Sequence, residues 1–274
     1  MTKNSYKNKK IIIIGGHEQA SLCLEYFLKL ELEVLLCICR LDDNGIDDIF
    51  PSLKKRCIEL NINYIQPKKI NSKSVFLKIK RLNPDIMFSL QNNMLLDNRW
   101  INFFNIKLGI INVHYAPLPK YAGYWPEMWA IWNKEKTFGV TMHYLSSGID
   151  KGDIIDQYPV KISPNEFRES LYNKCSKTCF KMIKKNLKFI LDKKVKTRKQ
   201  NMKIRSYYKK SLPNNGYIDL NWSKEKIELF YRAISFKGYV GPKIKIKGKI
   251  ISSFIEDYPF FKKKYLFNAD LKNK

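Results

Sequence analysis

Residues 11–39 read IIIIGGHEQASLCLEYFLKLELEVLLCIC, and this stretch decides the fold class. Residues 11–14 are an unbroken β-branched run that ends in two glycines, which is typical of a strand buried on both faces and followed by a tight turn. Residues 17–30 carry apolar side chains at helical spacing, and residues 33–39 form a second buried run. A strand, a helix and another strand in this order predict a parallel sheet with right-handed crossovers.

The same alternation continues to residue 191. We expect helices at 53–60, 72–82, 125–133 and 165–191, and strands at 62–65, 84–90, 108–114, 138–145 and after a polar loop at 146–155. A linker at 196–201 precedes a short helix and a two-stranded hairpin with Gly248 in its turn. The predicted architecture is an α/β, Rossmann-like and mostly parallel sheet over residues 1–200. A small C-terminal α+β appendix over residues 201–274 contains the hairpin.

The glycines after the first strand raise the question of a dinucleotide site. The dinucleotide fingerprint is G-x-G-x-x-G between a strand and a helix. Here Gly15 and Gly16 are adjacent, and Ala20 is the only small residue that follows at a comparable distance. We therefore interpret both glycines as turn residues.

The chain is strongly basic, with 51 Lys+Arg against 25 Asp+Glu and a formal net charge of +26 among 274 residues. Such a charge fits a protein that binds nucleic acid or a membrane surface. The basic residues are nevertheless spread along a chain rich in Lys, Asn and Ile, so we favour a compositional origin and expect neither partner. A modest positive field would still attract a small substrate that carries phosphate.

The six cysteines include no C-x-x-C pair, and no histidine or carboxylate stands beside them at a zinc-ligand spacing. Buried free thiols and no bound metal are the expectation. No apolar run approaches the ~18–20 residues that a membrane span needs, and the N-terminal run is too short for a secretion signal. We expect a cytoplasmic protein.

One of only three histidines, His114, ends an apolar strand two residues after Asn112. Side chains two apart on a strand share a face, and open α/β sheets bind ligands at the carboxyl ends of their strands. Asp150 follows in a later loop. Together the three suit transfer of an acyl group to an amine: imidazole takes the amine proton, amide stabilises the oxyanion and carboxylate orients the imidazole. The alternative is a hydrogen-bonded histidine without a catalytic role.

The surrounding segments are NVHYAPLPKYAGYWPEMWAI (112–131) and NKEKTFGVTMHYLSSGIDKGDII (133–155). They resemble the 10-formyltetrahydrofolate-dependent formyltransferases, which carry N-x-H-x-x-x-L-P-x-[YWF]-x-G, then G-V-T-x-H, then D-x-G-D. The resemblance implies the formyltransferase fold, 10-formyltetrahydrofolate as donor, and catalytic positions at Asn112, His114 and Asp150. SLQNNMLL (89–96) is similar to the folate-cradling loop, which uses mostly backbone groups. The implied donor contacts are Leu90, Gln91, Asn92, Met94, Leu95 and Ile149.

Several features separate the branches of that family. Ala122 stands where methionyl-tRNA formyltransferases usually carry arginine, and the appendix is short for their C-terminal barrel. Glycinamide ribonucleotide formyltransferases lack such an appendix. KYAGYWPEMWAIWN and RAISFKGY look most like the sugar N-formyltransferases, which act on nucleotide-linked amino sugars, commonly dTDP-linked 3- or 4-amino-6-deoxyhexoses, for surface glycans such as lipopolysaccharide O-antigen.

This resemblance implies a nucleotide-linked amino sugar as partner and a homodimer. The expected substrate contacts are Lys120, Tyr121, Trp125, Arg232 and Tyr239, whereas Trp129 and Trp132 sit at helical spacing and are expected in the core. Methionyl-tRNA formyltransferase remains the alternative function, with the +26 charge as its best support. A non-catalytic RNA-binding protein is a third interpretation.

Overall fold

A computed structural model describes residues 8–238, 241–246, 248–253, 259 and 263. Its centre is a seven-stranded sheet in the order β3-β2-β1-β4-β5-β7-β8. The strands are β1 (Lys10–Gly15), β2 (Glu33–Cys39), β3 (Tyr64–Ile65), β4 (Ile86–Leu90), β5 (Ile110–His114), β7 (Thr137–Tyr144) and β8 (Ile154–Lys161). The first five pair in parallel, and β7 and β8 pair antiparallel at one edge. The prediction of a mostly parallel α/β sheet is confirmed.

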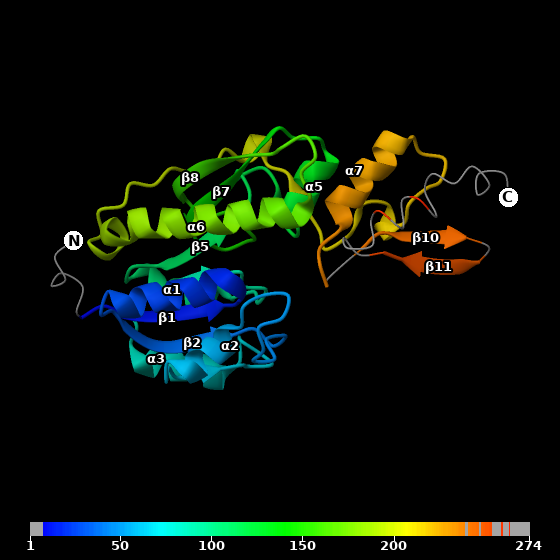
Figure 1. The fold of residues 1–274 in the computed structure, drawn as a ribbon. Coiled ribbons are helices and arrows are strands. Elements are labelled where there is room, and N and C mark those ends of the chain that lie inside the picture. The colour runs from blue at the N-terminus through cyan, green and yellow to red at the C-terminus, as the bar shows by residue number, and fades with distance from the viewer. Residues whose placement is uncertain (1–7, 239–240, 247, 254–258, 260–262, 264–274) are drawn as a thin grey trace.

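Helices cover both faces of this sheet (Figure 1). The helices are α1 (His17–Lys29), α2 (Leu53–Glu59), α3 (Lys73–Leu82), α4 (Asn98–Asn105), α5 (Pro126–Trp132), α6 (Arg168–Leu191) and α7 (Lys224–Ile234). Of these, α5 and α7 pack on α6 and on each other. Ile11 and Ile13 of β1 pack in the layer of α1 and α6, while Ile12 and Ile14 pack in the layer of α3 and α4. Because successive strand side chains point to opposite faces, the isoleucine run fills two cores at once.

Helix α4 was not expected from the sequence. It contains Asn98, Asn102 and Asn105, and asparagine is a poor helix former. The Asp97 side chain accepts a hydrogen bond from the Arg99 backbone N–H and caps the helix start, and the buried Trp100 anchors it under the sheet. Burial of its apolar face, rather than intrinsic propensity, therefore forms this helix.

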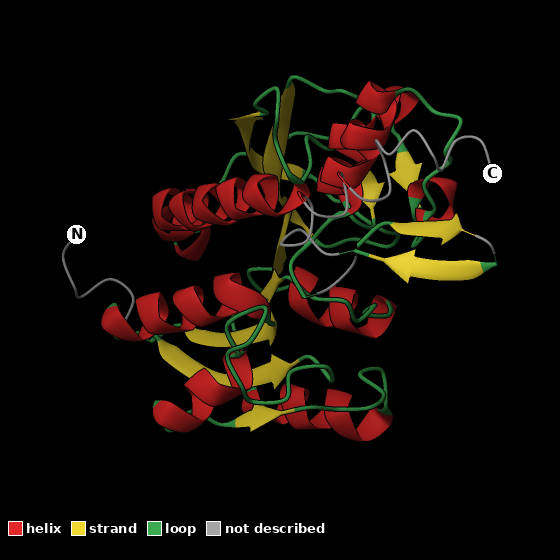
Figure 2. Cartoon of the chain, turned by 45° about the vertical axis from the view of Figure 1, so that its right-hand side comes forward, coloured by secondary structure: helices red, strands yellow, loops and turns green. Residues whose placement is uncertain are grey.

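The chain after α6 is tied to the preceding part by strand pairing. Two more short strands, β6 (Ala122–Gly123) and β9 (Tyr207–Tyr208), pair in parallel and were also not expected. Two 3-10 turns (Met202–Ile204 and Pro213–Gly216) lead to α7, and β10 (Lys243–Ile246) with β11 (Lys249–Ser252) forms the predicted hairpin. Figure 2 shows these elements gathered on one side of the chain. None of the helices among the described residues has the length and apolar character needed to cross a membrane.

Candidate active site

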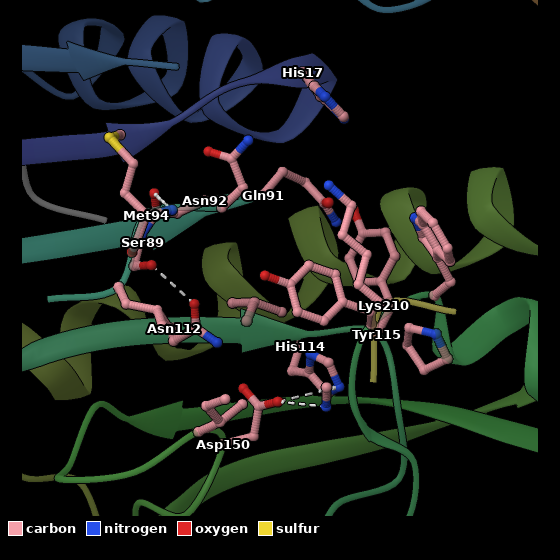
Figure 3. Close-up of a pocket in the computed structure, with 18 of the residues that line it drawn as sticks. His17, Ser89, Gln91, Asn92, Met94, Asn112, His114, Tyr115, Asp150 and Lys210 are labelled. Atoms are coloured by element: carbon pink, nitrogen blue, oxygen red, sulfur yellow. Dashed lines mark hydrogen bonds and ion pairs between the residues drawn. The ribbon is translucent and has the colours of Figure 1, made fainter. Parts of the chain in front are cut away.

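A cavity of about 470 Å³ opens at the carboxyl ends of β1, β4 and β5 (Figure 3). This is the edge at which open α/β sheets bind ligands, because the strand order reverses there between β1 and β4. The volume lies in the range of small-molecule sites. Its walls come from segments far apart in sequence: His17, Arg40, Asp42, Phe50, Ser89, residues 91–96, residues 112–115, residues 123–127, His143, Leu145, Ser146, residues 148–150, Arg168, Tyr172, Lys210 and Phe236.

Asn112 is held from both sides of its amide. The Ser89 hydroxyl donates to Oδ1 over 2.9 Å, and Nδ2 lies 2.9 Å from His143 Nε2. His143 Nδ1 lies 2.9 Å from the Tyr144 carbonyl oxygen, which can only accept, so Nδ1 carries the proton and Nε2 accepts from Asn112. Burial lowers the pKa of His143, which favours the neutral ring that this arrangement requires. One Nδ2 hydrogen of Asn112 is left for a further acceptor.

His114 is oriented by the motif loop that follows it. Its Nε2 lies 3.0 Å from the Tyr121 carbonyl oxygen, so Nε2 donates and the neutral ring keeps its lone pair on Nδ1. Asp150 Oδ2 lies 3.7 Å from His114 Nε2, and Asp150 Oδ1 lies 3.9 Å from His143 Nε2. The carboxylate therefore stands between two imidazoles, and Figure 3 shows it facing His114. It would stabilise His114 once that ring takes up a proton.

The loop that carries Asp150 is held in place by a close backbone approach at Gly152 and by hydrogen bonds from Gln200. A Cβ at Gly152 would stand 1.6 Å from the Tyr144 carbonyl oxygen, so only glycine fits this position without moving the loop. Gln200 Nε2 donates to the backbone oxygens of Asp150 over 2.8 Å and of Gly152 over 2.7 Å. Asp150 itself adopts a left-handed backbone, with φ of 52°, and so depends on these contacts.

The motif loop is pinned in the same way by β9. The Tyr121 backbone N–H donates to the Ser206 hydroxyl over 2.7 Å, and the Tyr124 N–H donates to the Tyr208 carbonyl over 2.9 Å. The Gly123 N–H donates to Asp150 Oδ2 over 2.8 Å. Because the Tyr121 carbonyl orients His114, β9 contributes to the geometry around His114 although it lies outside the motifs.

The structure brings together most of the residues that the sequence singled out. Asn112, His114 and Asp150 line the cavity, as do Gln91, Asn92, Met94, Leu95 and Ile149 of the expected donor side. Leu90 is a correction, because it is buried and its carbonyl oxygen accepts from the Gly16 N–H over 3.0 Å. Leu90 is the last residue of the buried strand β4, so its side chain lies in the core, whereas the residues that follow the strand line the cavity.

The expected substrate contacts need larger corrections. Trp125 lines the cavity, but Lys120, Tyr121 and Arg232 are not among its lining residues. The Tyr121 ring is stacked on Tyr208, with centroids 5.3 Å apart, and its hydroxyl donates to Glu135. Arg232 Nη1 donates to the Glu166 carbonyl oxygen instead. Tyr239 lies outside the described residues. Aromatic and cationic side chains beside a motif can equally pack or cap backbone, and the sequence did not separate these roles.

Sequence reasoning left the following cavity residues without a site role: Arg40, Asp42, Phe50, Glu127, Arg168, Tyr172, Lys210 and Phe236. Arg40 pairs with Asp42, and Arg168 pairs with Glu127 over 2.9 Å. Lys210 has no carboxylate partner within the described part of the chain. The sequence held one signal for this group of residues: Arg168 falls on the buried face of the amphipathic helix α6, where an arginine is unusual.

His17 lines the part of the cavity that also contains Phe50 and Tyr172. Its ring stacks on Phe50 with centroids 3.8 Å apart, and its Nδ1 lies 2.9 Å from the Tyr172 hydroxyl. Burial, together with the nearby Arg40 charge, lowers the pKa of His17 to about 3. The ring is therefore neutral at ordinary pH, and its Nδ1 shares a hydrogen bond with the Tyr172 hydroxyl. Among the described residues, no three His, Cys, Asp or Glu side chains gather in a way that could hold a metal ion.

Comparisons with known proteins agree on one family. A family model described as formyl transferase matches residues 41–187. The bifunctional polymyxin resistance protein ArnA of Wigglesworthia glossinidia brevipalpis is 34% identical over 227 residues, which cover 82% of this chain and 34% of that protein. The chain thus spans about a third of that relative. Methionyl-tRNA formyltransferase of Clostridioides difficile (strain 630) is 31% identical over 229 residues, covering 82% of this chain and 74% of that one.

Among solved structures, WlaRD, a sugar 3N-formyl transferase crystallised with dTDP and 5-N-formyl-THF, superposes with a TM-score of 0.70 at 28% identity. The superposition covers 89% of this chain and 84% of WlaRD. It therefore includes most of the C-terminal part that follows residue 200.

Proposed function

The chain belongs to the formyl transferase family, and from that premise we propose that it moves the formyl group of 10-formyltetrahydrofolate to the amine of a nucleotide-linked amino sugar. A dTDP-linked 3- or 4-amino-6-deoxyhexose is the substrate class we favour, with surface-glycan synthesis as its use. The observation that carries this proposal is the likeness to WlaRD across both the catalytic part and the C-terminal part of the chain.

The geometry supports the chemistry of formyl transfer. The amine nitrogen attacks the formyl carbon, a new C–N bond forms, and the bond from that carbon to the folate nitrogen breaks. His114 Nδ1 takes the proton that the amine loses, because Nε2 is already engaged with the Tyr121 carbonyl. The remaining Nδ2–H of Asn112 would meet the oxyanion that develops on the formyl oxygen. Asp150 would stabilise the imidazolium until its proton reaches the folate leaving nitrogen.

One end of the cavity fits the folate donor. Met94, Leu95, Leu96, Leu145 and Ile149 give this end an apolar lining beside Asn112. Leu95 exposes 65% of its surface, so apolar area is available to a flat aromatic ring. The Asn92 side chain bonds both the N–H and the carbonyl of Met94, which keeps the loop in one shape before any ligand binds.

The opposite end fits a sugar nucleotide. Lys210 lines the cavity as a cation without a carboxylate partner among the described residues, and it suits a diphosphate. Trp125, Tyr172 and Phe236 add aromatic surface to the wall of the same cavity. The amine of a compound held there would be presented to His114 from the side opposite the folate.

Methionyl-tRNA formyltransferase is the second candidate, because it is the activity named for a relative 31% identical to this chain and because the net charge is +26. Its test is salt dependence. A tRNA complex that neutralises several phosphates loses affinity with a log–log slope of roughly −0.7 to −0.9 for each contact, whereas a nucleotide sugar carries only its diphosphate.

The direct experiment incubates the protein with 10-formyltetrahydrofolate and a panel of dTDP- and UDP-linked amino sugars, with charged initiator tRNA as a parallel acceptor. Release of tetrahydrofolate is followed by absorbance, and the acceptor by mass spectrometry. We expect one formyl group to be added to an amino-sugar nucleotide. Formylation of the tRNA alone would establish the second candidate instead.

A further inference from the structure

We propose that Arg168 and Glu127 form the subsite for the hexose ring of the amine substrate, with Trp125 as its aromatic wall. This inference rests on the proposed function, since it says which part of the cavity reads the sugar rather than the nucleotide. All three residues line the cavity that contains His114.

The Arg168 guanidinium is buried and incompletely hydrogen-bonded. Its side chain is 3% exposed, and Nε donates to Glu127 Oε1 over 2.9 Å. Nη1 is buried without a hydrogen-bond partner, and Nη2 has no partner among the described residues. The guanidinium carbon lies 5.5 Å from the Trp125 ring centroid and 5.3 Å from that of Phe236. The plane is therefore held in place while donor hydrogens remain unused.

Stability alone does not account for this arrangement. Removing two charges from water is costly, and apolar residues of similar volume often serve as well or better. A buried N–H without an acceptor adds a further desolvation cost. Arg168 is also the first residue of α6, where the helix dipole disfavours a cation. Nη2 has no partner among the described residues and is not fully buried, so a ligand oxygen in the cavity would accept from it and offset part of this cost.

The charge balance points to a neutral hydroxyl-bearing group instead of phosphate. Glu127 already compensates the Arg168 charge, so the pair presents acceptors and donors with little net charge. Sugar hydroxyls both donate and accept, and the C–H face of a hexose is apolar enough to pack on an indole ring. The cation with no carboxylate partner in the described part of the cavity wall is Lys210, which leaves the diphosphate to that residue.

The test is Arg168→Lys. Lysine keeps a cation for Glu127 but cannot present the planar set of guanidinium donors. Binding is measured by calorimetry with two probes, dTDP and a dTDP-amino sugar that the wild-type protein formylates. We expect Kd for the amino-sugar nucleotide to rise about 10- to 100-fold, the range for a hydrogen bond to a charged group, while Kd for dTDP stays within about twofold. KM for the folate donor should not change.

Two further variants keep the result interpretable. Arg198→Lys is the matched control, because Arg198 is exposed, bonds Gln157 and does not line the cavity. The double variant Glu127→Gln/Arg168→Gln replaces the ion pair with two amides if the single variant folds poorly. It should show the same selective loss of amino-sugar binding.

Equal losses for dTDP and the amino sugar would place Arg168 against the nucleotide and overturn the inference. Unchanged Kd values with a lower unfolding temperature would make the pair purely structural and would also overturn it. If wild type formylates an amino-sugar nucleotide while Arg168→Lys behaves identically, only this inference fails. If wild type binds no amino-sugar nucleotide, the proposed function fails with it.

Discussion

Asn112 shows how far the role of one side chain depends on its immediate partners. Ser89 donates to its Oδ1 and His143 accepts from its Nδ2, so the amide cannot rotate without losing hydrogen bonds. Preorganised donors act on a transition state without reorganising at the moment of reaction. The two flanking residues therefore position Asn112, and neither has to touch the substrate.

Asn112→Ala should lower kcat by about 10²- to 10³-fold, the usual effect of removing one oxyanion donor. Ser89→Ala leaves the donor but frees its orientation, so the expected loss is about tenfold or less, corresponding to one neutral hydrogen bond. Both are measured as kcat at saturating folate and acceptor. If Asn112→Ala raises only KM for the folate, Asn112 is a binding residue and its assigned role is wrong.

His17 makes a prediction about stability against pH. Its pKa is lowered to about 3 in the folded chain, against an ordinary value of 6.5. Below pH 6.5 the unfolded chain takes up a proton that the folded chain refuses, so this stabilisation is complete above pH 6.5 and is lost as pH falls toward 3. The pKa of His143 is lowered as well and acts in the same direction.

Replacing His17 by glutamine should therefore flatten the loss of unfolding free energy on acidification. Between the two pKa values, the difference in unfolding free energy between wild type and variant should change by about 1.4 kcal/mol per pH unit. Urea unfolding at several pH values between 7 and 4 measures it. His143 stays in both proteins, so a residual slope is expected in each. Parallel curves for wild type and variant would contradict the prediction.

The β7–β8 loop is the element that joins fold and chemistry. β7 carries His143, and the chain must turn tightly after Tyr144 to bring Asp150 back beside it. Gly152 allows that turn because its Cα approaches the Tyr144 carbonyl too closely for any side chain. The position of the Asp150 carboxylate thus depends on a residue with no side chain of its own.

Gly152→Ala should displace the loop and lower kcat by on the order of 10²-fold, as expected for a shift of about 1 Å in a catalytic group. Gly248→Ala is the control, because Gly248 lies in the β10–β11 turn with nothing within 4 Å of a built Cβ, although its φ of 78° is positive, unlike that of Gly152. It should cost stability of about 1–2 kcal/mol and leave kcat unchanged. Equal kcat in both variants would show that the loop tolerates the displacement.

Across the entire chain, the active site depends on residues from both sides of the domain boundary predicted at residue 200. Gln200 and Arg205 bond the backbone of the Asp150 loop, with Arg205 Nη2 donating to the Ile149 carbonyl oxygen over 3.0 Å. Ser206 bonds the backbone of the motif loop, and Lys210 lines the cavity. The two predicted domains therefore share one site.

A chain that ends after residue 200 should lose formyl transfer completely even if it keeps its secondary structure. It lacks β9, and without β9 the Tyr121 carbonyl that orients His114 is no longer held. Circular dichroism reports folding, and single-turnover transfer reports catalysis. Ser206→Ala in the full chain removes only one hydrogen bond to Tyr121 and should reduce kcat by about tenfold at most. A folded truncated chain with the wild-type rate would contradict this dependence.

The sequence by itself determined the central sheet, the expected order of its strands along the chain, and the shared strand of Asn112 and His114. These follow from local rules, because strand and helix periodicities and the facing of alternate side chains are properties of neighbouring residues. The motif resemblance added the family. In the structure, the isoleucine run at 11–14 is a buried strand, and Asn112 and His114 lie two residues apart on one strand, as their local patterns indicated.

Only the tertiary structure decided which side chains face the cavity. Tyr121 stands beside the motif yet its ring packs away from the cavity, whereas Arg168 and Lys210, far along the chain, line it. Helix α4 and the β6–β9 pair likewise exist because distant segments bury or bond them. The physical reason is that an ion pair such as Glu127–Arg168, or a backbone bond such as Tyr121–Ser206, joins residues whose separation leaves no periodic trace in the sequence.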